Sequence, residues 1–383
     1  MGTEDRDAVV TSEVDGVAPG PAAREDDGGP ATVSPEREAA GPRRRVFTRR
    51  RALAWSAGVG GGLLLPPTAA AGALRAGYSG TPDLRARTRG RDAVWLGHAW
   101  VDGRRTDADV ASFLRPLSTT GIRDLYVHTG PLENDGTLRS DRYPRAEWLI
   151  AAVREALPGV RVQSWLGQHL ATEYPGGLDL DAPRSRENVL GAARQVLRVG
   201  FDGVHYDLEP LHSGGVSWLE LMDATWALTR EQGRVFSVAV PQIDPLPGLH
   251  TVAKALFDHP KWWSQEYFAQ TARRADQVAV MSYDTAMVTQ GLYGGYVAQQ
   301  TRLALEVTPP EVDLLMGLPA YHDNTLGHRE SAETVAAAIR GVRLELGRRD
   351  VERERFGVAL YVDFAATEQD WRSYREGWVE PPR

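Results

Sequence analysis

The chain of 383 residues contains no cysteine. Disulfide bonds and a lipid attached to an N-terminal cysteine are therefore excluded. The chain also lacks a comfortable membrane span, because its apolar run at 52–65 has about 14 residues, several of them glycine, and a membrane helix needs about 20. Excess basic charge is absent after residue 91, where the net charge is −10. This argues against nucleic acids and anionic membranes as partners.

The charges of the N-terminal quarter are segregated. Residues 1–42 carry ten acids and three arginines, are rich in glycine, proline and alanine, and show no hydrophobic period. We predict that this region is disordered. Residues 43–91 carry eleven arginines and one aspartate, so the basic charge is confined to the segment that precedes the main body.

An export signal is predicted within 43–73. The sequence Thr48-Arg49-Arg50-Arg51 precedes the apolar run 52–65, and prolines and alanines follow that run. These are the charged, apolar and small-residue parts of an export signal, and the arginine pair resembles the twin-arginine signal that addresses folded bacterial cargo. Residues 74–91 are expected to form a linker. We expect a secreted or extracytoplasmic protein, attached to a membrane only if 52–65 stays uncleaved as an anchor.

The body, residues 92–383, repeats one pattern. Apolar runs of strand length alternate with helix-like stretches such as Arg145–Leu157, Ser185–Val199, Val216–Gln232 and Ser331–Leu346. The strand-length runs are Ala93–Val101, Ile122–Thr129, Val160–Gln168, Phe201–Pro210, Arg234–Ile243, Ala275–Thr285, Val312–His322 and Arg355–Phe364. Buried parallel strands that alternate with helices in this number predict an α/β protein, a single (β/α)8 TIM barrel.

A doubly wound open sheet is the alternative fold. It predicts a glycine-rich phosphate loop after the first strand, and Gly97-His98-Ala99-Trp100 is not one. The histidines of the body are scattered without the spacing of a metal-binding motif. We therefore expect neither a metal ion nor another cofactor.

Asp207 and Glu209 are the first candidates for catalysis. The active site of such a barrel lies at the C-terminal ends of its strands, and both acids end the fourth run. Residues two apart on a strand share a face, so His205, Asp207 and Glu209 point the same way. A neighbouring carboxylate raises the pKa of a carboxylic acid and lets it hold a proton at neutral pH. Glu209 is therefore predicted to be a general acid.

Three strand ends resemble signatures of family 18 glycoside hydrolases, the chitinase-like barrels. Asp202-Gly203-Val204-His205-Tyr206-Asp207-Leu208-Glu209 resembles the family's Asp-Gly-x-Asp-x-Asp-x-Glu on strand four. Met281-Ser282-Tyr283-Asp284 resembles Met-x-Tyr-Asp on strand six, and Gly317-Leu318-Pro319-Ala320-Tyr321 resembles Gly-x-Pro-x-Tyr on strand seven. The architectural resemblance extends over residues 92–378.

The resemblance implies a retaining hydrolase of β-linked acetamido-sugar glycans, such as chitin or cell-wall polymers, in which the substrate's own acetamido group attacks. Glu209 would protonate the leaving oxygen and then activate water. Asp207 would orient the acetamido group and turn between an inward position and Glu209. Tyr283 would donate a hydrogen bond to the attacking group, with Asp284 beside it.

Two positions depart from the family pattern. His205 stands where the family has an aspartate, and Tyr361 stands where it usually has a tryptophan beneath the sugar. His205 either hydrogen-bonds Asp207 or is satisfied by another neighbour without a catalytic role. The residues expected to bind substrate are His205, Asp284, Tyr361, Trp100, Gln242 and Tyr321.

Two other functions stay open at this point. The first is a non-catalytic carbohydrate-binding barrel, and the second is a glycosidase for another sugar that uses Glu209 with a second carboxylate such as Asp284. In each case the partner is a polysaccharide or oligosaccharide, and we expect a monomer.

Overall fold

The computed structural model describes residues 67–251 and 261–382. The predicted disordered region 1–42 and the apolar run 52–65 of the export signal lie outside these residues, so export stays a prediction. Among the described helices, none combines the length and apolar character needed to cross a membrane.

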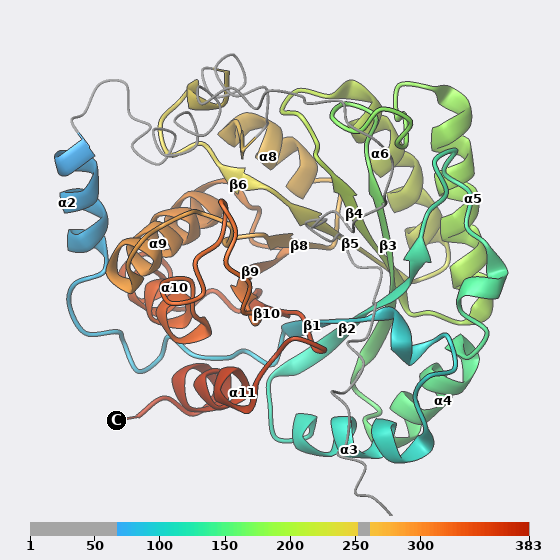
Figure 1. Cartoon of the computed structure of the whole chain (residues 1–383), viewed down its shortest axis with the longest axis horizontal. Helices are drawn as coiled ribbons and strands as arrows, with labels where there is room; N and C mark the ends of the chain where they lie inside the picture. The colour runs from blue at the N-terminus through green and yellow to red at the C-terminus, as the bar shows by residue number, and fades with distance from the viewer. Residues whose placement is uncertain (1–66, 252–260, 383) are drawn as a thin grey trace, which may run out of the picture.

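Parallel strands close into an eight-stranded barrel in the order β1-β10-β9-β8-β5-β4-β3-β2 (Figure 1). Their bounds are β1 (Asp92–Leu96), β2 (Ile122–Pro131), β3 (Arg161–His169), β4 (Gly203–Glu209), β5 (Val235–Val240), β8 (Gln277–Val280), β9 (Asp313–Pro319) and β10 (Phe356–Tyr361). The predicted (β/α)8 fold is confirmed. An open doubly wound sheet is excluded, because β1 pairs with both β2 and β10.

Helices surround the barrel (Figure 1). They are α2 (Pro67–Gly77), α3 (Asp107–Leu117), α4 (Ala146–Ala156), α5 (Pro183–Val199), α6 (Val216–Glu231), α8 (Gln265–Ala272), α9 (Gln290–Val307), α10 (Val335–Arg349) and α11 (Glu368–Tyr374). Short 3₁₀ turns span His98–Trp100 and Ser140–Arg142, and a π-helical turn spans Arg375–Val379.

Most strands end earlier than the apolar runs predict, and three of them show a local reason. The fifth run is divided at Pro241, which lacks a ladder donor; beyond it, β6 (Gln242–Ile243) pairs with β7 (Trp262–Trp263) in a separate two-stranded sheet. The first strand stops where the chain turns at His98–Trp100. The sixth stops at Val280, and residues 284 and 286 beyond it adopt positive φ angles.

Apolar side chains form two layers. The larger layer lies between the strands and the surrounding helices and includes Val94, Leu125 and Val204. The smaller one fills the barrel, where Trp95, Tyr126, Trp165 and Leu315 pack among alanines. Alternate residues of each strand supply the two layers, which explains the nearly continuous apolar runs in the sequence.

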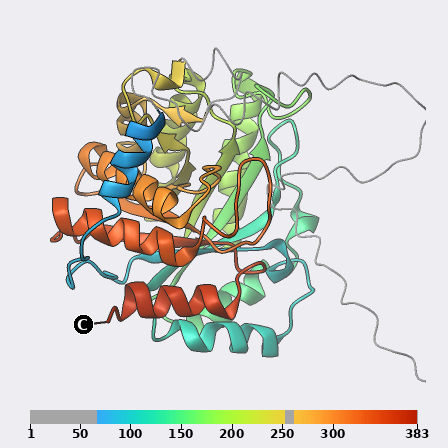
Figure 2. The ribbon, with the colours of Figure 1, turned by 60° about the vertical axis from the view of Figure 1, so that its left-hand side comes forward.

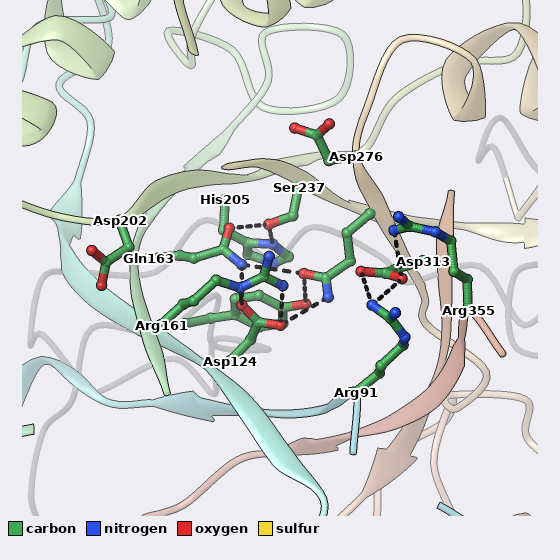
Figure 3. Close-up of polar contacts among 12 residues, drawn as sticks. Arg91, Asp124, Arg161, Gln163, Asp202, His205, Ser237, Asp276, Asp313 and Arg355 are labelled. Atoms are coloured by element: carbon green, nitrogen blue, oxygen red, sulfur yellow. Dashed lines mark hydrogen bonds and ion pairs between the residues drawn. The ribbon is translucent and has the colours of Figure 1, made fainter. Parts of the chain in front are cut away.

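A polar network fills the barrel at the N-terminal ends of the strands (Figure 3). Asp124 on β2 is fully buried and accepts hydrogen bonds from three side chains, those of Arg161, Gln163 and Gln277. Asp313 forms ion pairs with two arginines, Arg91 at 3.0 Å and Arg355 at 3.2 Å. Because each buried acid has positively charged or amide donors, the network carries its charge without leaving the carboxylates unpaired.

The predicted linker 74–91 is packed against the barrel. Figures 1 and 2 show α2 beside α9. Two glycines of α9 permit the close approach: a Cβ on Gly295 would lie 2.0 Å from the carbonyl oxygen of Leu74, and one on Gly294 would lie 2.1 Å from the ring of Tyr78. Arg340 of α10 also donates to the carbonyl oxygen of Gly80 at 2.8 Å. Within the described residues, the folded body therefore begins at α2 rather than at residue 92.

Candidate active site

The C-terminal ends of β3, β4, β8 and β10 bring the predicted catalytic residues together. Trp165 Nε1 donates to Asp207 Oδ2 at 3.0 Å. The ring of Trp165 lies 6.2 Å from that of Tyr361, which stacks on Tyr283 at 5.4 Å and 22°. A continuous row of side chains thus connects the acids of β4 with Tyr283 across the barrel mouth.

Asp207 is a buried carboxyl group with a single donor. Its residue is 4% exposed, and only Oδ2 has a hydrogen-bond partner among the described residues, leaving Oδ1 unpaired. Burial raises the pKa of Asp207 to about 7, although the Trp165 donor acts in the opposite direction. A buried polar atom without a partner is costly, so Oδ1 keeps the capacity to accept a further hydrogen bond.

Glu209 ends β4 beside His169 of β3 and is partly exposed. Burial first, and then the charges of Asp207 and Asp284, raise the pKa of Glu209 well above the usual value for a glutamic acid. This shift favours the protonated form of Glu209, which is the state that a general acid requires.

The small residue of the strand-seven motif makes room for Tyr283. A Cβ on Gly317 would lie 2.9 Å from Tyr283 Cε1 and 2.8 Å from the carbonyl oxygen of Val280. Any larger residue would displace the tyrosine ring. The resemblance at Gly317 thus has a local steric reason in this chain.

Gln242 holds the backbone around Tyr283 through hydrogen bonds. Its Nε2 donates to the backbone oxygen of Tyr283 at 2.6 Å and to that of Met281 at 3.2 Å, while its Oε1 accepts from the Tyr296 hydroxyl at 2.7 Å. Gln242 is buried. Its amide is thus occupied by the protein, and we place it among the residues that hold Tyr283 rather than among the substrate contacts predicted from the sequence.

His205 is fully buried and turned away from the acids. Its Nε2 accepts from Trp95 Nε1 at 3.0 Å, and its Nδ1 donates to Ser237 Oγ at 2.7 Å, since Ser237 Oγ donates onward to Gln163 (Figure 3). The ring stacks on Tyr126 at 3.8 Å. Burial lowers the pKa of His205 well below its usual value, so the ring is neutral.

The sequence left two possibilities for His205, a hydrogen bond to Asp207 or satisfaction by another neighbour. The structure shows the latter. Neither ring nitrogen is left for Asp207, and no atom of the side chain is exposed to a substrate. The predicted hydrogen bond to Asp207 and the predicted substrate contact are therefore not formed. His205 instead joins the aromatic interior to the polar network at the base of the barrel.

The remaining predicted contacts differ in exposure. Trp100 is 4% exposed, packs on Phe113 and donates to Asp363 at 2.6 Å, so its ring faces are covered rather than offered to a sugar. Tyr361 is half-buried at the centre of the aromatic row. Tyr321 donates to Asp284 Oδ1 at 2.6 Å, and Asp284 is 49% exposed.

His328 and Glu333 are two site residues that sequence reasoning missed. Both lie in the segment between β9 and α10, and both approach Asp284 or its neighbour Thr285. No local motif marks them, because the contact joins residues more than forty positions apart. In the described part of the chain, no three histidine, aspartate or glutamate side chains gather as a metal site would require.

Comparisons with known proteins show a shared fold but little sequence similarity. No family model and no curated protein sequence matches this chain. Among solved structures, it is similar to a class V chitinase from Pseudomonas fluorescens Pf-5 (TM-score 0.51, 12% identity, 76% of this chain and 99% of that chain). It is also similar to the spore cortex-lytic enzyme SleL of Bacillus megaterium QM B1551 (TM-score 0.53, 12% identity, 78% and 75%) and a chitinase from Chromobacterium violaceum ATCC 12472 (TM-score 0.50, 12% identity, 78% and 100%). The chain thus has the chitinase-like TIM-barrel fold that its strand motifs implied.

Proposed function

We propose that the protein is a retaining glycoside hydrolase that cleaves β-linked acetamido-sugar glycans, with Glu209 as general acid and base. One observation carries the proposal: Glu209, whose pKa is raised, lies at the C-terminal end of β4 beside the buried carboxyl of Asp207, at the mouth of an aromatic-lined barrel. This is the chemical equipment for protonating a leaving glycosidic oxygen.

The proposed reaction has two steps. The substrate's acetamido oxygen attacks the anomeric carbon while Glu209 gives its proton to the leaving oxygen. This step produces a cyclic oxazolinium ion and releases the leaving sugar with a free hydroxyl group. Glu209 then takes a proton from water as that water opens the ring, so the anomeric configuration is retained. The unpaired Oδ1 of Asp207 accepts the acetamido N–H, and the Tyr283 hydroxyl donates to the acetamido oxygen.

The first prediction concerns substrate and inhibitor together. A panel of soluble glycans with and without 2-acetamido groups is expected to yield products only from the acetamido members, measured by mass spectrometry of reducing ends. A thiazoline that mimics the oxazolinium ion is expected to inhibit that hydrolysis competitively, since it occupies the position of the intermediate.

The same experiment also distinguishes the two alternative functions, a glycosidase with a protein nucleophile and a carbohydrate-binding barrel. Hydrolysis that the thiazoline leaves unaffected would assign the reaction to a protein nucleophile such as Asp284. Binding of acetamido oligomers without hydrolysis would support a carbohydrate-binding barrel.

A second prediction follows from the donor to Asp207. The reaction needs Asp207 ionised and Glu209 protonated, so kcat/KM is expected to rise with pH through the pKa of Asp207, about 7, and to fall where Glu209 loses its proton. Trp165→Phe removes the donor that lowers the pKa of Asp207. The rising limb should then move to higher pH by about one pH unit.

The measurement is the pH profile of kcat/KM for the wild type, Trp165→Phe and Trp226→Phe. Trp226 lies on α6, outside the barrel interior, and its variant should keep the wild-type profile. A rising limb that stays in place in Trp165→Phe, or moves to lower pH, would contradict the role given to Asp207.

A further inference from the structure

The segment between β9 and α10 encloses a histidine between two carboxylates. His328 is 1% exposed, and its Nδ1 lies 3.4 Å from Asp284 Oδ1 and 3.4 Å from Glu333 Oε2. Its ring stacks on Tyr321 at 4.2 Å. Tyr321 in turn donates to the same oxygen of Asp284. The ring therefore touches both members of the Tyr321–Asp284 pair at the barrel mouth.

Glu333 ties the same segment to the end of β8. Its side chain is fully buried, and it accepts from the Thr285 backbone nitrogen at 3.0 Å and from Thr285 Oγ1 at 3.0 Å. The Ala286 backbone nitrogen also donates to the Gly327 oxygen at 2.6 Å. These bonds hold the residues directly after Tyr283 in place.

The backbone just after Tyr283 adopts an unfavourable conformation. Asp284 has φ = 56° and Ala286 has φ = 58°, in the left-handed region that non-glycine residues seldom occupy. Such a conformation persists only where the surroundings enforce it. The contacts of His328 and Glu333 supply that enforcement beside the proposed catalytic tyrosine.

Two carboxylates flank His328 and favour its positively charged form. Burial lowers the pKa of His328, but the adjacent Asp284 and Glu333 carboxylates outweigh it and raise that pKa to about 9. The other titratable groups that face Asp284 or Glu333 are Glu209, Lys261, Tyr283, Tyr293, Tyr296, Tyr321 and Tyr361. Neither ring nitrogen of His328 has a hydrogen bond of good geometry among the described residues, and Nδ1 lies at ion-pair distance from both acids.

We infer that His328 is a positioning residue, whose positive ring holds Asp284, the Tyr321 hydroxyl and the strained segment after Tyr283 in the arrangement that binds the reacting sugar. The inference rests on the proposed hydrolase function for its effect on catalysis. The arrangement of the ring itself can be tested without any substrate.

The catalytic test uses His328→Gln, which keeps a polar side chain and removes the charge, and His328→Arg, which restores it. His328→Gln is expected to lower kcat by about 10- to 100-fold, because small displacements of reacting groups have effects of that size. His328→Arg should recover part of the loss. His322→Gln is the matched control, since His322 lies on the same segment, is 44% exposed and contacts Asp370 instead.

The substrate-free test is the NMR titration of the His328 ring in the wild type and in Glu333→Gln. A midpoint near pH 9 in the wild type, moved to lower pH in Glu333→Gln, is expected. Because the folded pKa lies above the usual 6.5, this charge stabilises the fold fully below pH 6.5, and that stabilisation is lost as pH rises through 9. The melting temperature of the wild type should therefore fall toward that of His328→Gln between these pH values.

A His328 midpoint at or below 6.5 would overturn the inference, as would an unchanged kcat in a folded His328→Gln protein. If the wild type hydrolyses no glycan, the proposed function fails, and the titration and melting curves still decide whether the charged ring is held between the acids.

Discussion

Glu209→Gln is expected to lower kcat on unactivated acetamido-sugar oligomers by about 10²- to 10⁴-fold, the usual contribution of a positioned general acid. The amide has nearly the same shape as the protonated carboxyl, but it has no proton to release to the leaving oxygen. Binding of oligomers should therefore survive, and calorimetry on the inactive variant is expected to give an affinity close to that of the wild type.

The leaving group separates acid catalysis from a general loss of structure. An aryl glycoside with an acidic phenol needs little protonation, so Glu209→Gln should be impaired much less on it than on an oligosaccharide. Glu231→Gln is the control, because Glu231 ends α6 and is exposed. Equal cleavage of unactivated oligomers by Glu209→Gln and the wild type would refute the assignment of the acid.

Asp92→Ala is expected to reduce the free energy of unfolding by about 3–5 kcal/mol. Asp92 begins β1 and is fully buried. Its oxygens accept from four donors, the Trp378 Nε1 (2.9 Å), the Val358 nitrogen (3.0 Å), the Thr88 hydroxyl (2.7 Å) and the Tyr374 hydroxyl (2.8 Å). Removing the carboxyl leaves these donors unpaired and removes the polar attachment of Tyr374 and Trp378 to β1.

Urea unfolding at pH 8 measures this effect. Burial raises the pKa of Asp92 to about 6, so the carboxylate is ionised at that pH in spite of its surroundings. Asp141→Ala is the control, since Asp141 is exposed and pairs with Arg139 at the surface. An unfolding midpoint for Asp92→Ala equal to that of the control would show that the network around Asp92 adds nothing to stability.

The order of elements and the acid pair on β4 could be predicted from the sequence. A strand buried on both faces has a continuous apolar run, and such runs alternating with helices leave few folds other than a barrel. Asp207 and Glu209 lie two residues apart on one strand, so the strand period alone places them on one face. Gly317 belongs to a motif whose steric reason, room for Tyr283, became visible only in three dimensions.

Contacts between distant segments decided the rest. His205 faces inward as the strand period requires, yet its partners Trp95 and Ser237 come from β1 and β5, and no local pattern names them. Gln242 stands at the end of an apolar run, but its amide is taken by the backbone around Tyr283. Pairing of this kind depends on strand register around a closed barrel, which a single sequence does not encode locally.

The sequence by itself thus determined the barrel, the acid pair on β4 and the tyrosine that follows β8, because each depends on the period of one element or on a short motif. The tertiary structure alone decided that His205 is neutral and buried, and that His328 and Glu333 hold Asp284. Burial and facing charges are set by neighbours far away in the chain, and they fix protonation and orientation only once the barrel has closed.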